Sequence, residues 1–165
     1  LSSPAVVLRA FSRPLRLANR LLTWIAPYRQ VSLGGAKTEV CSDPILVQRY
    51  WADPLCHRTL TAAYLSAMAE GSRELLSMGG ELECPMLVLD AELDSVVEAA
   101  AATLLWDAVP PALLERHRLA GFRHEIFHDL QRGEAQQLSA AWLSRFLAQR
   151  AGNPVPTPDT QLEPQ

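Results

Sequence analysis

The chain has 165 residues and a mass of 18.2 kDa, which is the size of one ordinary domain. Its composition, 48% hydrophobic and 20% charged, excludes disorder over most of the length, and no apolar run approaches the roughly 18 residues that a bilayer-spanning helix needs. The net charge of −3 lacks the basic excess on which binding to a nucleic-acid backbone depends, so we expect no nucleic-acid partner.

The cysteines and the start of the chain bear on cellular location. Cys41, Cys56 and Cys84 are an odd number at wide spacing without a CxxC pair, which argues against a disulfide framework or a zinc finger. We therefore expect a reducing compartment and a cytoplasmic protein. The chain begins at Leu1 rather than Met, and residues 1–7 lack the charged start of a signal peptide. We expect an N-terminal part, with any targeting signal, to be missing.

The first half of the chain predicts an opening strand followed by three helices. Apolar residues recur on one side of an amphipathic helix over 15–25, and Arg16 and Arg20 lie on another side. We expect this helix to stop near Pro27. The other two helices carry start and stop signals. Asp43 as N-cap and Pro44 at the first helical position begin a short helix that ends before residues 53–54, and Gly79-Gly80 ends a longer helix over 59–78.

The second half alternates strands with helices. Residues 86–90 and 113–119 predict strands, and residues 97–106 and 138–148 predict helices. We expect the last helix to turn Trp142, Leu143 and Phe146 inward. This alternation indicates an α/β fold, a parallel sheet with crossover helices, into which the helical block looks inserted. The proline-rich tail from Gly152 to Gln165 has almost no apolar mass, so we expect it to be disordered.

Two polar side chains follow the two strands of the second half. Asp94 comes a few residues after the first strand and His124 a few residues after the second. Because ligand sites of open parallel sheets lie beyond the carboxyl ends of the strands, the two side chains are expected to converge. An Asp that orients a His is the acid–base half of a nucleophile–His–Asp triad. The alternative is that both are ordinary surface residues of loops.

Five short segments, in this order, resemble the α/β-hydrolases, and within them the monoacylglycerol lipase and lysophospholipase group, also called serine aminopeptidase-like. The segments are Ser2-Ser3-Pro4-Ala5; Ser42-Asp43-Pro44 with Tyr50; Ala52-Asp53-Pro54-Leu55 with Thr61; Asp94-Ser95-Val96-Val97; and Gly121-Phe122-Arg123-His124-Glu125-Ile126. The resemblance covers roughly residues 1–148.

The resemblance implies a fold, a division of the chain and a reaction. It implies the C-terminal part of an α/β-hydrolase fold, with a core strand at 1–8, a helical cap at 9–82 and a core carrying the acid and base loops at 83–150, followed by the tail at 151–165 that composition predicts to be disordered. It also implies a serine hydrolase of carboxylic esters such as monoacylglycerols or lysophospholipids, with Asp94 as the acid, His124 as the base and neither metal nor organic cofactor. The family's nucleophile elbow, G-x-S-x-G, and its oxyanion loop are not in this chain, so we expect a fragment that is inactive alone.

Other interpretations of the same residues stay open. Ser77-Met78-Gly79-Gly80 resembles half of a nucleophile elbow, but a charged helical stretch precedes it, so we favour a helix end. His124-Glu125-Ile126-Phe127-His128 has the H-E-x-x-H spacing of a zinc metallopeptidase, but it lacks a long helix and a later His. Cys56 beside His57 suggests a thiol nucleophile only weakly, because adjacent side chains rarely point the same way. A non-catalytic binding or remnant protein is a further alternative.

The predicted cap helix over 15–25 also has two interpretations. In one, Leu15, Leu22, Trp24 and Ile25 touch lipid while arginines meet anionic headgroups, which would give peripheral membrane contact. In the other, which we favour, it is an ordinary helix packed on the core with solvated arginines. The oligomeric state is not indicated by the sequence.

Overall fold

The computed structural model describes residues 1–7, 13–32, 40–57 and 59–152. The helices are α1 (Arg13–Ile25), α2 (Pro44–Ala52), α3 (Ala62–Ser77), α4 (Thr103–Ala108) and α5 (Arg132–Gly152). The strands are β1 (Gln30–Ser32), β2 (Thr59–Thr61), β3 (Met86–Ala91) and β4 (Leu114–Leu119). Short 3-10 turns occur at Gly79–Glu81, Pro111–Leu113 and Ile126–His128.

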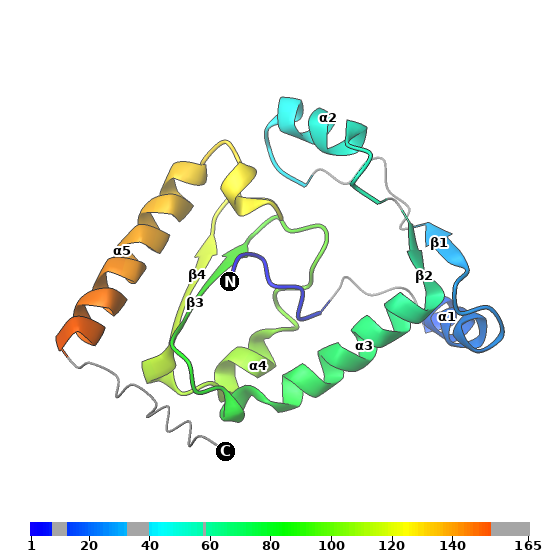
Figure 1. Ribbon diagram of the computed structural model, residues 1–165, viewed down its shortest axis with the longest axis horizontal. Coiled ribbons are helices and arrows are strands. Elements are labelled where there is room, and N and C mark those ends of the chain that lie inside the picture. Colours follow the sequence, from blue (N-terminus) through cyan, green and yellow to red (C-terminus); the bar gives the residue numbers. More distant parts are fainter. Residues whose placement is uncertain (8–12, 33–39, 58, 153–165) are drawn as a thin grey trace, which may run out of the picture.

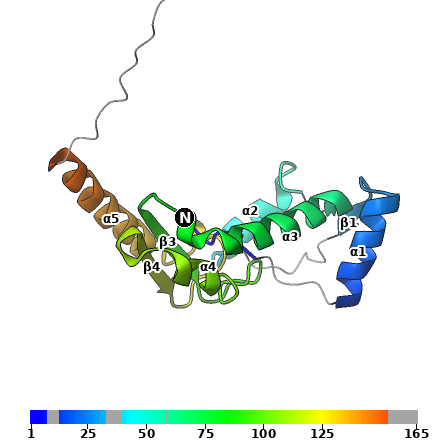
Figure 2. The same ribbon diagram turned by 90° about the horizontal axis from the view of Figure 1, so that it is seen from below.

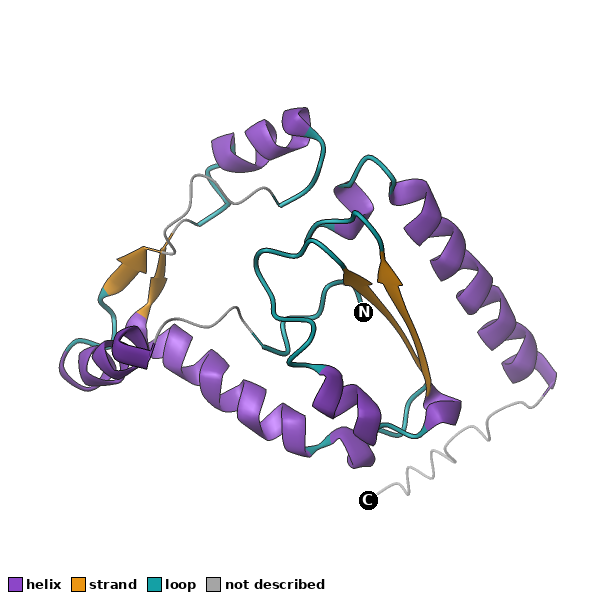
Figure 3. Ribbon diagram, turned by 180° about the vertical axis from the view of Figure 1, so that it is seen from behind, coloured by secondary structure: helices purple, strands orange, loops and turns teal. Residues whose placement is uncertain are grey.

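A parallel pair of strands forms the centre of the molecule (Figure 3). β3 and β4 pair in register from Met86 opposite Leu114 to Ala91 opposite Leu119, as the alternation of strands and helices predicts. The start of the chain lies on the other side of β3, where Ser2 forms a parallel bridge with Leu89. The sheet is therefore extended by residues 1–3, and Leu8, the end of the predicted core strand, lies outside the described residues.

Successive residues of β3 supply two apolar clusters on opposite faces of the sheet. Leu87, Leu89 and Ala91 pack toward α5, in a cluster with Phe122 and Ile126. Val88 points to the other face and packs with residues in and around α4, which are Val6, Ala102, Leu105, Trp106 and Val109. Leu87 through Ala91 are all buried, as expected for a strand covered on both faces. Full burial of one such side chain stabilises the fold by about 1.5–3 kcal/mol.

Of the helical block, α1, β1 and β2 lie away from the sheet, whereas Leu75 and Leu76 at the end of α3 pack on the cluster that contains Val88. β1 and β2 pair antiparallel, and Figures 1 and 2 place them with α1 at the opposite end of the molecule from α5. Polar groups join α1 to α3. The Asn19 amide donates to Ser66 Oγ at 3.0 Å, and the Thr23 hydroxyl donates to the carbonyl of Ala62 at 3.0 Å.

The favoured interpretation of α1 as a helix with its apolar side packed on the core is wrong. Its hydrogen bonds to α3 use Asn19 and Thr23, and most of its large apolar side chains remain exposed to solvent, whereas Leu22 is half-buried. The exposed ones are Leu15, Leu17, Leu21, Trp24 and Ile25, with exposed fractions from 46% to 84%. In the described part of the chain, no helix is both long and apolar enough to cross a bilayer.

Three local expectations are corrected by long-range contacts. Residues 59–61 form β2 instead of starting a helix, because they pair with β1. Residues 97–102 do not form a helix: Val97 forms a β-bridge, 99–102 form turns, and the Glu98 N–H donates to the distant carbonyl of Val7 at 2.7 Å. Helix α5 turns Trp142 and Phe146 inward but leaves Leu143 49% exposed. The tail beyond Gly152, predicted to be disordered, lies outside the described residues.

Candidate active site

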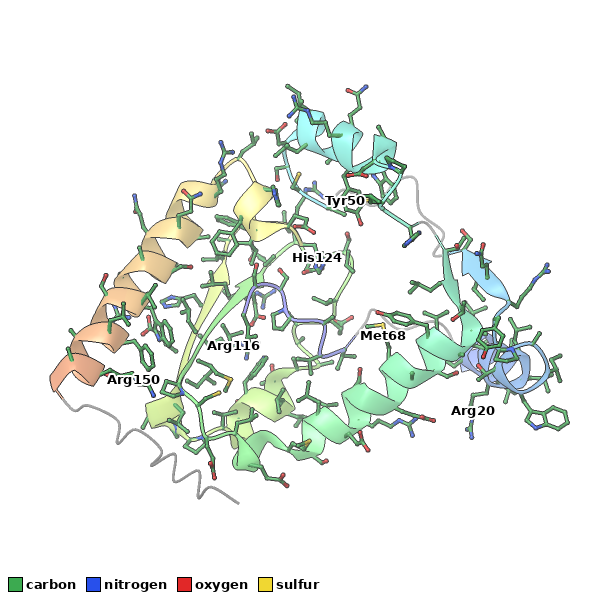
Figure 4. All side chains as sticks on the ribbon, viewed as in Figure 1. Arg20, Tyr50, Met68, Arg116, His124 and Arg150 are labelled. Carbon is green, nitrogen blue, oxygen red and sulfur yellow. The ribbon has the colours of Figure 1, made fainter. Side chains whose placement is uncertain are left out.

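Asp94 and His124 meet beyond the carboxyl ends of the paired strands. Asp94 lies on the loop after β3, His124 lies on the loop after β4, and Nδ1 of His124 is 2.9 Å from Oδ2 of Asp94. The carboxylate is buried, with a side-chain exposure of 3%, whereas the imidazole is 22% exposed. Figure 4 shows His124 on the side of the sheet edge that faces α2. The two residues that the sequence singles out are thus brought into contact.

Backbone contacts between the two loops hold this pair together. The Leu93 N–H donates to the Phe122 carbonyl at 2.9 Å, so the residue just before Asp94 is joined directly to the residue two positions before His124. Phe122 is fully buried and anchors its loop in the core. Gly121 has a φ of +77°, a conformation that favours glycine, and its N–H donates to Glu92 Oε2 at 3.0 Å.

The two oxygens of the Asp94 carboxylate have different partners. Oδ1 accepts from the amides of Val96 and Val97 at 2.8 and 2.9 Å, which leaves Oδ2 for the imidazole. Burial alone would raise the pKa of Asp94. The hydrogen bonds from His124, Val97 and Val96 outweigh burial and hold this pKa below its ordinary value. The carboxylate is therefore ionised and fixed in orientation at neutral pH.

This geometry determines what His124 can do chemically. An ionised Asp94 favours the tautomer with a proton on Nδ1, which leaves the lone pair on Nε2. Within the described residues, Nε2 has no hydrogen-bond partner, and the ring is partly open to solvent. An imidazole in this state can accept a proton from a hydroxyl group placed at Nε2 and can return it to a leaving group.

Ser77 and His128 have different surroundings. Ser77 is the last residue of α3, and its exposed hydroxyl donates to the Glu74 carbonyl at 2.6 Å, as expected for a helix end. His128 has a side-chain exposure of 62% and its Nδ1 lies 3.2 Å from Oε2 of Glu125.

The H-E-x-x-H spacing does not produce the geometry that a zinc site needs. Only residues 126–128 are helical, in a 3-10 turn, so the two histidines do not share one face of an α-helix. No cluster of three or more His, Cys, Asp or Glu side chains suited to a metal ion occurs among the described residues. The predicted thiol candidate, Cys56 with His57, follows α2 in a turn.

Asp129 is a polar residue near the pair that sequence reasoning missed. Its side chain is 1% exposed, and Oδ2 accepts hydrogen bonds from the backbone of Arg123, the residue before His124, and from Ser42. Ser42 and Asp129 are 87 positions apart in the chain. No local pattern predicts such a contact, although Ser42 lies in one of the segments that resemble the family.

The comparisons with known proteins agree with this architecture. A family model described as serine aminopeptidase, S33, matches residues 1–131. The structure of a monoacylglycerol lipase from Paleococcus ferrophilus superposes with a TM-score of 0.77 at 22% identity, over 86% of this chain and 56% of that one. The structure of a soluble variant of monoglyceride lipase from Saccharomyces cerevisiae, in complex with a substrate analog, gives 0.72 at 16% identity, over 87% and 54%.

The chain therefore spans little more than half the length of either structure. The two similarities show that it has part of an α/β-hydrolase fold, with the paired parallel strands in its sheet. Because the family model covers most of its length, the chain belongs to the serine aminopeptidase S33 family.

Proposed function

We propose that this chain supplies the acid and the base of a serine hydrolase that cleaves carboxylic esters. Asp94 is the acid and His124 the base. The observation that carries the proposal is the 2.9 Å contact between them at the carboxyl edge of the parallel sheet. The nucleophilic serine lies outside these residues, because the sequence contains no G-x-S-x-G segment. Neither a metal nor an organic cofactor is required for this chemistry.

The reaction assigns each group one task. Nε2 of His124 removes the proton from the serine hydroxyl as its oxygen attacks the ester carbonyl, and it then delivers that proton to the leaving alcohol. In the second step His124 removes a proton from water as the water oxygen attacks the acyl-enzyme carbonyl. The proton then passes to the serine oxygen, which releases the carboxylic acid product. Asp94 holds the imidazole in the required tautomer and stabilises the imidazolium that forms in both steps.

We further propose that residues 9–82 form a cap over this edge of the sheet, with residues 1–8 and 83–150 as the core. Figure 4 shows Tyr50 of α2 and Met68 of α3 on the sides of their helices nearer to His124. Burial raises the pKa of the Tyr50 phenol, and the neighbouring Cys56 and Glu125 act in the same direction. Tyr50 is thus a neutral hydroxyl close to the loop of the base.

The proposed substrates are small lipid esters such as monoacylglycerols or lysophospholipids. The lipase names of the two similar structures support this class. The exposed apolar side of α1 supports peripheral contact with a membrane, because its leucines and Trp24 lie on a helix that also carries Arg16 and Arg20. A cytoplasmic location stays a prediction from the use of cysteine.

The first test is the reading frame upstream of the codon for Leu1. An in-frame strand followed by G-x-S-x-G supports the proposal, and a stop codon directly upstream contradicts it. The 165-residue chain is expected not to react with a fluorophosphonate probe. Labelling of Ser77 would contradict the proposal, and it would also contradict the assignment of Ser77 as the end of a helix.

The second test measures ester hydrolysis by the longer protein that this reading frame encodes. Asp94→Asn is expected to lower kcat by on the order of 10⁴, because the wrong imidazole tautomer is then favoured. His128→Ala is the matched control, since it removes an exposed imidazole four residues from the base and is expected to change kcat less than about twofold. Loss of activity in His128→Ala, with zinc bound to the parent, would favour the metallopeptidase. Binding of lipid without turnover would favour a non-catalytic protein.

A further inference from the structure

The backbone on both sides of His124 is held by groups outside its own loop segment. The N–H of Arg123 donates to Oδ2 of Asp129 at 3.2 Å, and the N–H of Glu125 donates to the carbonyl of Val40 at 2.7 Å. His124 is the residue between these two contacts. Its position relative to Asp94 therefore depends on where Asp129 and Val40 lie.

The buried carboxylate of Asp129 accepts four hydrogen bonds. Its Oδ2 accepts from the N–H of Arg123, from the N–H of Ser42 and from the hydroxyl of Ser42, each at 3.2 Å. Its Oδ1 accepts from the N–H of Leu130 at 2.7 Å. A carboxylate that is only 1% exposed is tolerated when donors replace the water it has lost. Moving any of these donors away would leave a buried carboxylate oxygen without a hydrogen bond, which costs free energy. The donors are therefore held close to Asp129.

Both contacts around His124 lead to the same segment of the helical block. Val40 accepts from Glu125, and Ser42 donates to the carboxylate that also binds Arg123. Val40 and Cys41 are 5% and 3% exposed, so this segment is packed rather than free in solvent. It leads directly into α2, whose N-cap is Asp43. Residues 40–42 and the backbone of 123–125 cannot shift independently.

We propose that Asp129 is a positioning residue that, with Val40 and Ser42, fixes the backbone of His124 and couples the base to the segment leading into α2. The inference rests on the proposed role of His124 as the base. Asp129 touches no reacting atom and acts through the distance between His124 and Asp94. A shift of α2 that pulls on residues 40–42 would change this distance, and a displacement of about 1 Å can cost on the order of 100-fold in rate.

The test is proton NMR on the 165-residue chain, which needs no nucleophile. An Nδ1–H of His124 bonded to Asp94 gives a downfield resonance, assigned by its loss in His124→Gln. Asp129→Ala is expected to speed the exchange of this proton with water by about tenfold or more, because four donors lose their acceptor. Ser42→Ala, which removes only the hydroxyl contact, should speed it by about threefold.

The conservative variant separates geometry from charge. In Asp129→Asn the amide oxygen can accept the same three hydrogen bonds as Oδ2, so the downfield resonance should persist. Proton exchange in Asp129→Asn that is as fast as in Asp129→Ala would overturn the positional account. Ser139→Ala is the matched control for Ser42→Ala, because its hydroxyl donates within α5 to Ala135, and it should leave the resonance unchanged.

Amide exchange provides a second measurement that does not depend on the imidazole. Exchange of the Arg123 and Glu125 amides should accelerate by about tenfold in Asp129→Ala, while amides of β3 keep their protection. If Asp129→Ala and Ser42→Ala are folded and neither the resonance nor these amides change, the inference is overturned. A parent chain without the resonance would contradict the proposed His124–Asp94 pair, and the two amides would still decide whether the backbone is held.

Discussion

Arg116 on β4 and Asp90 on β3 form an ion pair across the parallel sheet, with Nε of the guanidinium 2.5 Å from Oδ2. The side chain of Asp90 is 3% exposed and that of Arg116 is 27% exposed. A second guanidinium nitrogen donates to the carbonyl of Ala99 at 3.4 Å. Because Arg116→Ala would leave a buried carboxylate without its partner, we expect the free energy of unfolding to fall by about 3 kcal/mol.

Urea denaturation checks this prediction, with a lower midpoint at an unchanged slope. Arg118→Ala is the matched control, since Arg118 is an exposed arginine two residues along the same strand. It should change the free energy of unfolding by less than about 0.5 kcal/mol. Equal losses in the two variants would show that the ion pair is not what stabilises the sheet here.

Lowering the pH should remove the contribution that ionised Asp94 makes to the free energy of unfolding. The pKa of Asp94 lies lower in the folded chain than its ordinary value of 3.8, so the unfolded chain binds this proton more readily. The contribution is complete above 3.8 and is lost as the pH falls through the lower folded pKa. Urea denaturation across this range should show a steeper loss of stability in the parent than in Asp94→Asn. Parallel pH profiles would contradict the prediction.

Ser3 has a strained backbone that glycine should relieve. It has a φ of +39°, it is 5% exposed, and its buried hydroxyl oxygen has no hydrogen-bond partner among the described residues. Ser3→Gly removes both the strain and the unsatisfied hydroxyl, and we expect the free energy of unfolding to rise by about 1 kcal/mol. In the exposed neighbour, Ser2→Gly should instead lower it by about 0.5 kcal/mol through chain entropy. Destabilisation by Ser3→Gly, measured by thermal unfolding, would refute the strain argument.

The 3-10 turn after α3 packs against α4 too closely for a side chain at Gly79. A Cβ there would lie 2.6 Å from both the Cβ of Ala108 and the carbonyl oxygen of Leu105. Gly79→Ala is therefore expected to lower the free energy of unfolding by about 2 kcal/mol. At Gly80 the nearest atom would be 3.9 Å away, so Gly80→Ala is the control and should be within about 0.5 kcal/mol of the parent. Chemical denaturation distinguishes the two.

Membrane contact through α1 is tested by sedimentation with lipid vesicles. Vesicles of phosphatidylglycerol should bind the chain more strongly than vesicles of phosphatidylcholine, because α1 carries Arg16 and Arg20 beside its exposed apolar side. Leu21→Ala should weaken this binding by about threefold, since Leu21 is 59% exposed on α1. Leu104→Ala, which changes a leucine 73% exposed on α4, should not weaken it. Equal effects of the two variants would contradict contact through α1.

Local chemistry made much of the fold predictable from the sequence. Asp43 accepts from the amides of Ile45 and Leu46 and begins α2, as its place before Pro44 indicates. The apolar run after Pro85 becomes the buried strand β3. The meeting of Asp94 with His124 follows from a general property of parallel sheets, because both residues lie on loops that follow the carboxyl end of a strand.

Contacts between distant residues were beyond local reasoning. Residues 97–102 are rich in alanine, yet the amide of Glu98 is used by Val7 and the amides of Val96 and Val97 by Asp94, so no helix forms there. The hydrogen bond between Ser42 and Asp129 joins two unremarkable polar residues whose pairing no spacing rule describes. The hydrogen bonds that join α1 to α3 and leave the apolar side of α1 exposed are likewise contacts between residues far apart in the sequence.

The run of charge along β4 has a consequence for the behaviour of the molecule in concentrated solution. In the described residues, the outer edge of β4 has no strand beside it, which leaves backbone groups open to a strand of another molecule. The middle of this strand is Glu115-Arg116-His117-Arg118, so a strand added at this edge would strip water from charged side chains. The side chains that form ion pairs within the chain thereby also discourage aggregation through its open edge.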